Sequence, residues 1–475
     1  MYNIKLTGIL NTYEYEELAK VFLKPVEFIV SVEDGVALSK NETKRNLYQY
    51  LSELTGKKPE WGILTGVRPV KLTSELFEKY ADKTNEELLK TKVKNVLLNE
   101  YLVSETKADL LISIYEYQKG VLEKTEEDKV GIYIGIPFCP TRCLYCSFTS
   151  NQASDSKITA YMGALYKEIE FVATEMKTAK LKLETIYIGG GTPTTLDADK
   201  LRELLAHIRN SFDFSELKEF TVEAGRPDTI DAEKIRVIKD AGVSRISINP
   251  QSMHDKTLKL IGRSHTADDI EDAFSTVRTC ISEANTKSNT SNLDTNINSG
   301  FDIIINADVI AGLPCETVDD YIETLKKVIA LEPENITIHT LAVKRASKLV
   351  DENRDYHYEH GEIVKDMMSQ GNELLKKSGY VPYYLYRQKH MTGNLENVGW
   401  CKKGTAGIYN IRIMEENQTI IALGAGGITK VFYPDENRIE RVPNVSNYEI
   451  YCLKIEDMIN RKRENLFIGR KNDVN

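Results

Sequence analysis

The chain has 475 residues, a formal net charge of -9 at pH 7 and a pI near 5.6. This acidic balance argues against a general nucleic-acid-binding protein, because such proteins carry a surplus of Lys and Arg. The length exceeds the size at which single hydrophobic cores stop growing, so two or three domains are expected.

The cysteine usage and the apolar runs favour a cytoplasmic protein with no membrane partner. Seven cysteines occur without paired spacings, which indicates reduced thiols. The first residues, MYNIKLTGIL, lack a basic and apolar leader. No apolar run approaches the roughly 18 residues that a membrane span requires.

The first part, residues 1–128, is expected to form a small α/β domain. Strand-like YNIKLTG and PVEFIVSV flank the helical pattern TYEYEELAKVFL, and apolar residues recur at three- and four-residue steps in 44–54 and 85–118. Glycine and proline in WGILTGVRPVKL place Trp61 and Arg68 on a loop. Arg68 could face a substrate, or could be a capping or surface arginine. The charged run 123–129 is typical of a solvated linker.

The second part, residues 129–345, alternates strand and helix patterns. The strand candidates are 131–136, 184–188, 218–222, 244–248, 302–310 and 335–341. Helical patterns such as 157–176 and 318–332 connect successive strands, which implies parallel strands with right-handed crossovers. Six units are too few for a closed eight-stranded barrel, so the fold class is α/β with an open, partial (β/α)6 barrel.

A polar segment interrupts this alternation at residues 286–300. TKSNTSNLDTNINSG is rich in Ser, Thr, Asn and Gly and has almost no apolar residues. It is expected to be a flexible surface insertion at the amino-terminal end of the fifth strand, away from the chemistry.

Three cysteines follow the first barrel strand with the spacing CxxxCxxC: Cys139, Cys143 and Cys146 in IPFCPTRCLYC. Three thiolates can hold three irons of a 4Fe-4S cluster and leave the fourth iron open for a small-molecule chelate. The alternative is zinc, whose closed sites normally need four ligands. The next cysteine, Cys280, lies 134 positions after Cys146, so a zinc site would need a distant ligand.

Further polar and glycine residues follow the next strands. The turn after the second barrel strand consists of Gly189, Gly190, Gly191, Thr192 and Pro193. Because glycine has no side chain, the backbone of this turn can approach a ligand closely, although such turns often only connect a strand to a helix.

Two carboxylates stand at later strands. Glu223 could accept hydrogen bonds from a ligand, or be an exposed loop glutamate. Asp308 lies within a buried parallel strand, where an unpartnered aspartate is costly, and this favours a functional role.

The cysteine motif after a strand, with Tyr145 before its last cysteine, resembles the radical S-adenosylmethionine superfamily. The resemblance implies that the open iron binds S-adenosyl-L-methionine (SAM) and that one electron cleaves its sulfonium to a 5'-deoxyadenosyl radical. It also implies cofactor contacts. The residues expected near the cofactor are Tyr133, Gly190, Gly191 and Thr192. Glu223 would contact its amine or ribose, and Gln251 its adenosine. Arg263 would pair with the methionine carboxylate, and Asp308 would make a further SAM contact.

A narrower resemblance comes from IPFC, YCSF, GGGTPT, the Gln251 and Arg263 segment, AGLP and YYLYRQKHMTGNLENVGW. These are similar to oxygen-independent coproporphyrinogen III dehydrogenases, and WGILTGVRP is most like their clostridial and bacillar branch. The resemblance implies oxidative decarboxylation of two propionates of coproporphyrinogen III to give protoporphyrinogen IX. It also implies an electron donor such as flavodoxin or ferredoxin.

Two positions depart from that family's pattern. Phe148 stands where a further cysteine is common, and Gly135 stands where a histidine is frequent. Both features occur in relatives that include haem-binding chaperones and methylating, haem-degrading enzymes. The sequence therefore leaves open a dehydrogenase, a haem chaperone with a ligand such as His339 or His390, and a radical SAM methyltransferase or ring-opening enzyme.

The third part, residues 346–475, is expected to form an α/β lid over the open side of the barrel. Its cations and those just before it could bind porphyrin carboxylates, and its aromatic residues could line an apolar ring. The alternative is that the aromatic residues are core and the cations are solvated. The residues concerned are Lys344, Arg345, Arg387 and Lys389, and Tyr383, Tyr384, Tyr386 and Trp400. The turn GAGGITK, with Gly424, suits either ligand approach or a tight bend.

Overall fold

The computed structural model describes residues 1–66, 68–81, 85–122, 125–146, 150–285, 303–342, 356–388 and 391–468. The predictions for the insertion 286–300, Phe148, Lys344, Arg345, Lys389 and His390 lie outside these residues. None of the described helices combines the length and the apolar character that a bilayer crossing requires.

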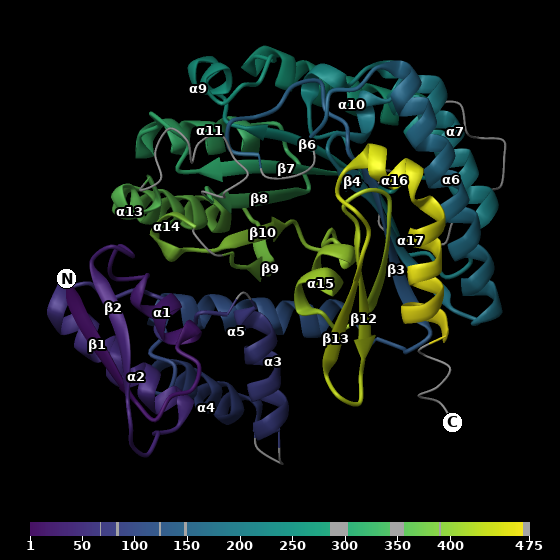
Figure 1. Ribbon diagram of the computed structural model, residues 1–475. Coiled ribbons are helices and arrows are strands. Elements are labelled where there is room, and N and C mark those ends of the chain that lie inside the picture. Colours follow the sequence, from purple (N-terminus) through teal and green to yellow (C-terminus); the bar gives the residue numbers. More distant parts are fainter. Residues whose placement is uncertain are drawn as a thin grey trace.

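An eleven-stranded sheet runs through the molecule in the order β13-β12-β11-β3-β4-β5-β6-β7-β8-β10-β9 (Figure 1). Its centre consists of the six predicted strands, which all pair in parallel. They are β3 (Lys129–Ile136), β4 (Lys182–Gly190), β5 (Glu219–Glu223), β6 (Arg245–Gln251), β7 (Ile304–Ala311) and β8 (Asn335–Thr340). Because the described sheet ends at β13 and β9 without closing, it forms the predicted partial barrel.

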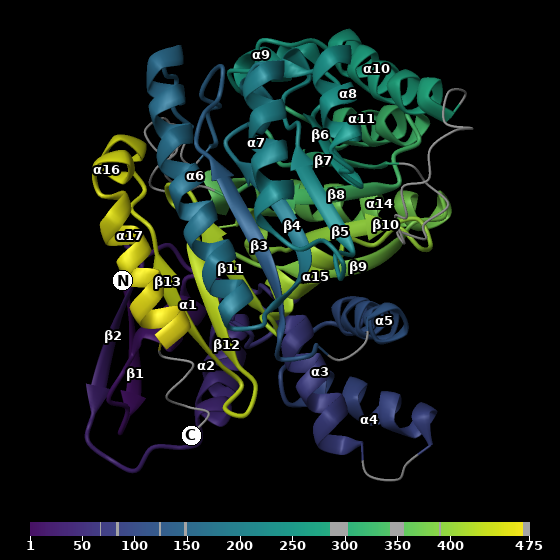
Figure 2. The same cartoon turned by 90° about the vertical axis from the view of Figure 1, so that its right-hand side faces the viewer.

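Helices between successive central strands cover one face of the sheet (Figures 1 and 2). They are α6 (Asp155–Thr178), α7 (Ala198–Ser211), α8 (Ala232–Asp240), α9 (Asp255–Leu260), α10 (Ala267–Asn285) and α11 (Val318–Ala330). Three single turns of 3-10 helix, η1 (Pro193–Thr195), η2 (Pro227–Thr229) and η3 (Thr392–Asn394), lie in connecting loops.

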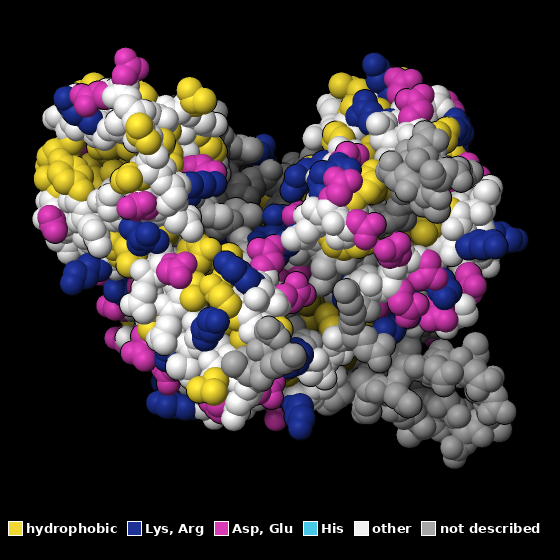
Figure 3. Space-filling view, turned by 90° about the horizontal axis from the view of Figure 1, so that it is seen from below, with side chains coloured by type: hydrophobic (Ala, Val, Ile, Leu, Met, Phe, Trp, Pro, Cys, Tyr) yellow, Lys and Arg dark blue, Asp and Glu magenta, His cyan; other side chains and the backbone are white. Residues whose placement is uncertain are grey.

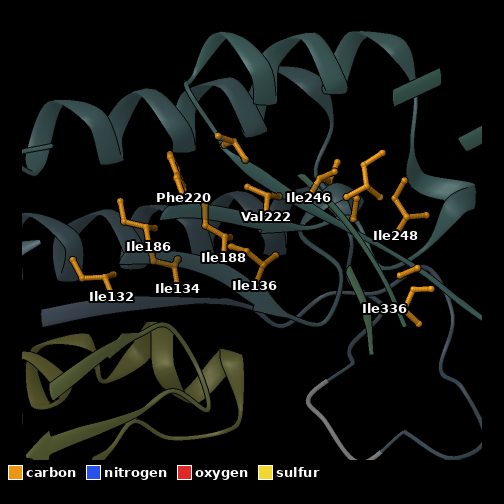
Figure 4. Close-up of a cluster of buried hydrophobic side chains, with 14 of the residues drawn as sticks. Ile132, Ile134, Ile136, Ile186, Ile188, Phe220, Val222, Ile246, Ile248 and Ile336 are labelled. Atoms are coloured by element: carbon orange, nitrogen blue, oxygen red, sulfur yellow. The ribbon is translucent and has the colours of Figure 1, made fainter. Parts of the chain in front are cut away.

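The central strands have an apolar face and a polar face because side chains alternate along a strand. In β3, Ile132, Ile134 and Ile136 are fully buried on the helix side, as Figure 4 shows together with their neighbours on β4 to β6 and β8. The intervening positions, such as Tyr133, point to the opposite, concave side. The same alternation places polar side chains of β4 to β8 on that concave side, where a ligand can reach them.

The N-terminal part contains a parallel pair, β1 (Tyr2–Thr7) and β2 (Phe28–Glu33), with α1 (Tyr13–Ala19) and α2 (Lys40–Thr55). These elements share a hydrophobic core of their own that includes Leu6, Leu18 and Leu51. In contrast, α3 (Pro69–Tyr80), α4 (Glu86–Asn99) and α5 (Glu105–Val121) contribute to the main core. The division of the chain at residue 128 stays a prediction.

The helical pattern over 85–118 is interrupted in the structure. Leu102 has a φ of 55°, in the left-handed region, and the side chain of Ser104 accepts a hydrogen bond from the Lys107 backbone N–H at the start of α5. A Ser followed by Glu105 is a usual helix start, so the break has a local cause.

The C-terminal part supplies strands to both edges of the same sheet, so the sheet continues across the predicted boundary at residue 345. Strand β11 (Thr419–Leu423) pairs in parallel with β3, and the other four strands are antiparallel to their neighbours. These are β9 (Val381–Tyr386), β10 (Asn397–Cys401), β12 (Ile428–Tyr433) and β13 (Arg438–Pro443). That boundary stays a prediction.

The helices of the C-terminal part cover both sides of the barrel. They are α13 (Tyr356–Glu359), α14 (Gly361–Lys377), α15 (Ile408–Glu415), α16 (Tyr448–Leu453) and α17 (Ile455–Lys462), which η4 (Arg463–Ile468) continues. Helix α15 lies on the concave side, where the Tyr409 ring stacks on Tyr187 of β4 at 4.5 Å between ring centroids. It therefore covers part of the open side, as predicted for the lid.

An ion pair joins the N-terminal loop to the C-terminal part. Viewed from below, the surface of the molecule shows two lobes with a hollow between them (Figure 3). Arg68 Nη2 lies 2.5 Å from Glu416 Oε1, which also pairs with Lys430 and Arg441, each at 3.1 Å. Arg68 occupies the N-cap position of α3, but its side chain makes no capping hydrogen bond and pairs with Glu416 instead.

The raised pKa of Glu415, which precedes Glu416 in the chain, predicts that the free energy of unfolding depends on pH. Burial raises the pKa of Glu415 to about 7, against an unfolded value of about 4.3. Between these values the folded state binds more protons, so this group makes stability fall as pH rises. The unfolding free energy of Glu415→Gln minus that of wild type should therefore rise by on the order of 2 kcal/mol from pH 4.5 to pH 8. Urea unfolding at the two pH values measures this difference.

A matched control is Glu416→Gln, which leaves Arg68, Lys430 and Arg441 without their carboxylate and should destabilise the protein at both pH values. If the difference between Glu415→Gln and wild type is the same at pH 4.5 and 8, Glu415 is ionised normally and the prediction is wrong.

Candidate active site

All the predicted site residues line one cavity of about 420 Å³ at the carboxyl ends of the central strands. They are Tyr133, Cys139, Cys143, Cys146, Gly190, Gly191, Thr192, Glu223, Gln251, Arg263 and Asp308. They come from five strands and the loops that follow them. Parallel strands bring these ends to one edge, which is why residues up to 175 positions apart meet here.

The cysteine loop is fixed by hydrogen bonds to two other segments. Cys139 N–H donates to the Asn151 carbonyl at 3.0 Å, and Leu144 N–H donates to the Ile261 carbonyl at 2.9 Å. The Thr141 hydroxyl donates to the Gly262 carbonyl at 3.0 Å. These contacts hold the backbone of the three cysteines independently of any bound group.

The thiols suit an iron cluster better than a single ion. Cys143 is buried, and Cys139 and Cys146 are partly exposed to the cavity. Within the described ranges, no three His, Cys, Asp or Glu side chains are arranged to share one metal ion. A cubane needs a wider arrangement, because each thiolate binds a separate iron. Burial raises the pKa of Cys139 to about 11, so iron would displace a proton there.

Arg226 lies beside the cysteines and was missed in the sequence analysis. Its side chain is 3 % exposed, and Nη1 donates to the Thr141 hydroxyl at 2.9 Å and lies 3.9 Å from the Cys143 sulfur. A nearby guanidinium favours the thiolate form that binds metal. The sequence could have marked Arg226 as a site residue, because it lies three residues after Glu223 in the loop that follows the same strand.

The glycine-rich turn packs directly on the cysteine loop. A Cβ on Gly191 would lie 2.5 Å from the Phe138 carbonyl oxygen, and Gly190 has a φ of 108°. Thr192 N–H donates to the same Phe138 carbonyl at 2.8 Å, and its hydroxyl lies 3.4 Å from the Cys139 sulfur. These glycines are therefore needed for contact between two loops of the protein, as well as for an open cavity wall.

Gln251 and Arg263 have buried polar atoms without partners in the described structure. Gln251 has a φ of 68°, and its side-chain Oε1 accepts no hydrogen bond. Arg263 donates to the Asn249 carbonyl at 2.6 Å and to the Tyr145 hydroxyl at 3.2 Å, while its Nε has no partner. Strained backbone and unsatisfied buried groups are typical of ligand sites.

The carboxylates on the concave side have opposite pKa shifts. Burial raises the pKa of Glu223 to about 7, although the Tyr187 hydroxyl donates a hydrogen bond to it. Burial alone would raise the pKa of Asp308 too, but His339, 3.5 Å away, and Asn306, which donates at 2.8 Å, hold it below its ordinary value. Asp308 thus has the partners that a buried aspartate needs.

The cavity wall opposite the cysteines is aromatic and polar. Tyr384, Tyr386, Tyr409 and His339 line it, and the Tyr386 hydroxyl lies 3.4 Å from His339 Nδ1. The alternation along β8 could have shown that His339 faces the cavity. Tyr409 could not have been found, because no local motif places α15 on the concave side.

The remaining substrate candidates divide between core and cavities. Tyr383 and Trp400 are fully buried, as the core alternative predicts, whereas Tyr384 and Tyr386 line the cofactor cavity. Arg387 lines a different cavity. Gly424 makes a tight bend, since a Cβ there would lie 2.5 Å from the Gly135 carbonyl oxygen.

Comparison with known proteins places this site in a family context. The sequence profile of the Radical SAM superfamily matches residues 133–328. The oxygen-independent coproporphyrinogen-III oxidase-like protein HemZ of Bacillus subtilis is 38% identical over 423 residues, which span 87% of this chain and 79% of the relative. The heme chaperone HemW of Haemophilus influenzae is 28% identical over 64% of this chain and 71% of its own length. The coproporphyrinogen III oxidase HemN of Escherichia coli, described as a radical SAM enzyme, gives a TM-score of 0.49 at 18% identity over 74% of this chain and 73% of its own.

Proposed function

Because the chain belongs to the oxygen-independent coproporphyrinogen-III oxidase-like family of the radical SAM superfamily, we propose that it decarboxylates two propionates of coproporphyrinogen III oxidatively to vinyl groups. The cofactors of this superfamily are a 4Fe-4S cluster and SAM. The observation that supports the proposal most is the single cavity that combines the three cysteines with an aromatic and polar wall.

Different residues of the cavity would bind the cluster and SAM. Cys139, Cys143 and Cys146 would hold three irons, and the Arg263 guanidinium, which has no carboxylate partner among the described residues, would bind the SAM carboxylate. When bound in this cavity, the cluster and SAM would supply the radical chemistry that the decarboxylation of the propionate arms requires.

The concave wall would keep water from the reacting atoms. Tyr384 and Tyr409 are buried, and Tyr386 is half-buried beside them. Glu223 and Gln251 would accept and donate hydrogen bonds to the hydroxyl and amine groups of the cofactor. His339 stays oriented by Asp308 and Tyr386, with its ring at the cavity surface.

The Arg263 assignment predicts a specific loss. Arg263→Lys keeps the charge but not the planar fork, so SAM should bind about tenfold more weakly while the iron content stays normal. Equilibrium dialysis with labelled SAM and an iron assay measure the two quantities. Unchanged SAM affinity would show that Arg263 does not bind the cofactor.

Haem binding is the second candidate function, since a named heme chaperone is among the relatives and His339 offers a ligand at the cavity surface. One assay separates the candidates. Reconstituted, reduced protein is incubated anaerobically with coproporphyrinogen III and SAM, and the products are analysed by mass. Loss of two carbon dioxides supports the dehydrogenase. Methyl transfer or ring opening supports haem degradation, and stoichiometric haem retention without turnover supports the chaperone.

A further inference from the structure

A second cavity of about 520 Å³ lies between the N-terminal unit and the C-terminal part. Its walls come from residues 56–66, from the start of α14, and from the connection between β9 and β10. Gln388 lines both this cavity, hereafter the junction cavity, and the cofactor cavity. The two cavities are therefore adjacent at this residue.

Arg387 is a buried cation in the wall of the junction cavity. The residue is 4 % exposed, and its Nη atoms donate to the Leu64 carbonyl at 2.6 Å and to the Asn394 side chain at 2.7 Å. Its Nε has no hydrogen-bond partner within the described chain, and no carboxylate described there forms an ion pair with it. A buried charge without a counter-ion is costly.

The carboxylate that acts on Arg387 electrostatically is already engaged. Glu396 accepts hydrogen bonds from Lys107 Nζ at 2.6 Å and from Trp61 Nε1 at 2.9 Å. The Arg387 guanidinium lies 4.9 Å from the centre of the Trp61 ring, which fixes its orientation. Burial lowers the pKa of Arg387 to about 10, which leaves it charged at neutral pH. Arg387 is therefore a buried cation in the cavity wall whose Nε is without a partner among the described residues.

The other walls indicate which kind of anion would pair with Arg387. The lysines and glutamates of the lining balance one another: Lys20, Lys57, Lys58 and Lys365 stand against Glu17, Glu60, Glu359 and Glu362, and Val21, Pro59 and Met391 add apolar surface. The charge in excess is therefore the buried Arg387, and the apolar residues beside it favour an organic carboxylate over an inorganic ion. A tetrapyrrole carries several carboxylate arms around a wide ring, and SAM and the cluster already need the cofactor cavity, so one edge of the ring must extend elsewhere.

We propose that the junction cavity binds a carboxylate arm of the tetrapyrrole through Arg387, so that the N-terminal unit forms part of the substrate site. This inference rests on the proposed function for the class of ligand. It assigns a role to residues 56–66, which lie outside the matched superfamily region.

Calorimetric titration of the reconstituted full-length protein with coproporphyrin III, in the presence of SAM and without reductant, tests the inference. Arg387→Gln should weaken binding at least about tenfold, because hydrogen bonds to a charged group are lost. Gly66→Phe should weaken it as well. Gly66 lines the junction cavity, has no positive φ, and a Cβ there meets nothing within 4 Å, so the new ring would occupy the cavity.

Two controls have matching substitutions away from both cavities. Gly163→Phe adds the same ring on the exposed face of α6, where a Cβ also meets nothing within 4 Å. Arg202→Gln removes an exposed arginine on α7. Both should bind coproporphyrin III like wild type. If Arg387→Gln fails to fold, Gly66→Phe still decides the question.

The outcomes separate this inference from the proposed function. Wild-type affinity in Gly66→Phe, or no binding of coproporphyrin III by wild type, overturns the inference. If wild type decarboxylates coproporphyrinogen III while Gly66→Phe and Arg387→Gln bind normally, only the inference fails. If wild type lacks that activity while both variants lose affinity, only the proposed reaction fails.

Discussion

Cys143→Ala should lose both its iron–sulfur absorbance and its reductive cleavage of SAM. Two thiolates hold a 4Fe-4S cluster poorly, and Cys143 is the buried cysteine of the three, next to Arg226. The effect should be complete within detection, because no other described cysteine lines the cavity. Iron and sulfide per chain, and 5'-deoxyadenosine released after reduction, are the measurements.

Cysteines outside the motif provide the controls for this result. Cys280 is buried on α10 and Cys315 is exposed after β7. Cys280→Ala and Cys315→Ala should keep the cluster and the cleavage activity. Four irons per chain and normal 5'-deoxyadenosine release in Cys143→Ala would contradict the assignment of the cluster to these cysteines.

Lys462→Met should lower the free energy of unfolding by about 3–5 kcal/mol. Lys462 and Glu168 are both fully buried, and Lys462 Nζ lies 2.7 Å from Glu168 Oε1. Tyr451 and the Gly424 N–H also donate to Glu168, at 2.6 and 2.8 Å. Without Lys462, a buried carboxylate keeps neutral donors but loses its counter-ion, and α17 loses this ion pair with α6.

Chemical denaturation of two further variants separates charge from packing. Lys454→Met removes an exposed lysine at the start of α17 and should change stability by less than about 1 kcal/mol. Adding Glu168→Gln to Lys462→Met removes the unpaired charge and should recover part of the loss. Equal stability of Lys462→Met and wild type would show that this buried pair does not stabilise the fold.

The barrel strands and the position of the site could be predicted because both depend on local patterns. Alternation in β3, with Ile132 and Ile134 on one face and Tyr133 on the other, is visible in the sequence. Parallel strands then bring their carboxyl ends together, which is enough to place Cys139 near Asp308. This placement follows from the strand order alone and does not require knowledge of how the side chains pack.

Features that depend on contacts between distant segments could not be predicted. Arg68 pairs with Glu416, which lies 348 positions later, and nothing near either residue signals the contact. The placement of Tyr409 on Tyr187 and of Arg387 on Trp61 has the same origin. The sequence also contained no indication that β11 and β10 pair with β3 and β8, because the residues of a strand do not specify which strand it pairs with.

Mössbauer spectroscopy of protein reconstituted with iron-57, before and after SAM is added, tests the central claim most directly. The account predicts a 4Fe-4S cluster in which SAM changes the signal of one iron, since Cys139, Cys143 and Cys146 leave that iron free. A cluster that does not respond to SAM, or protein that binds zinc at these thiols instead of iron, would contradict it.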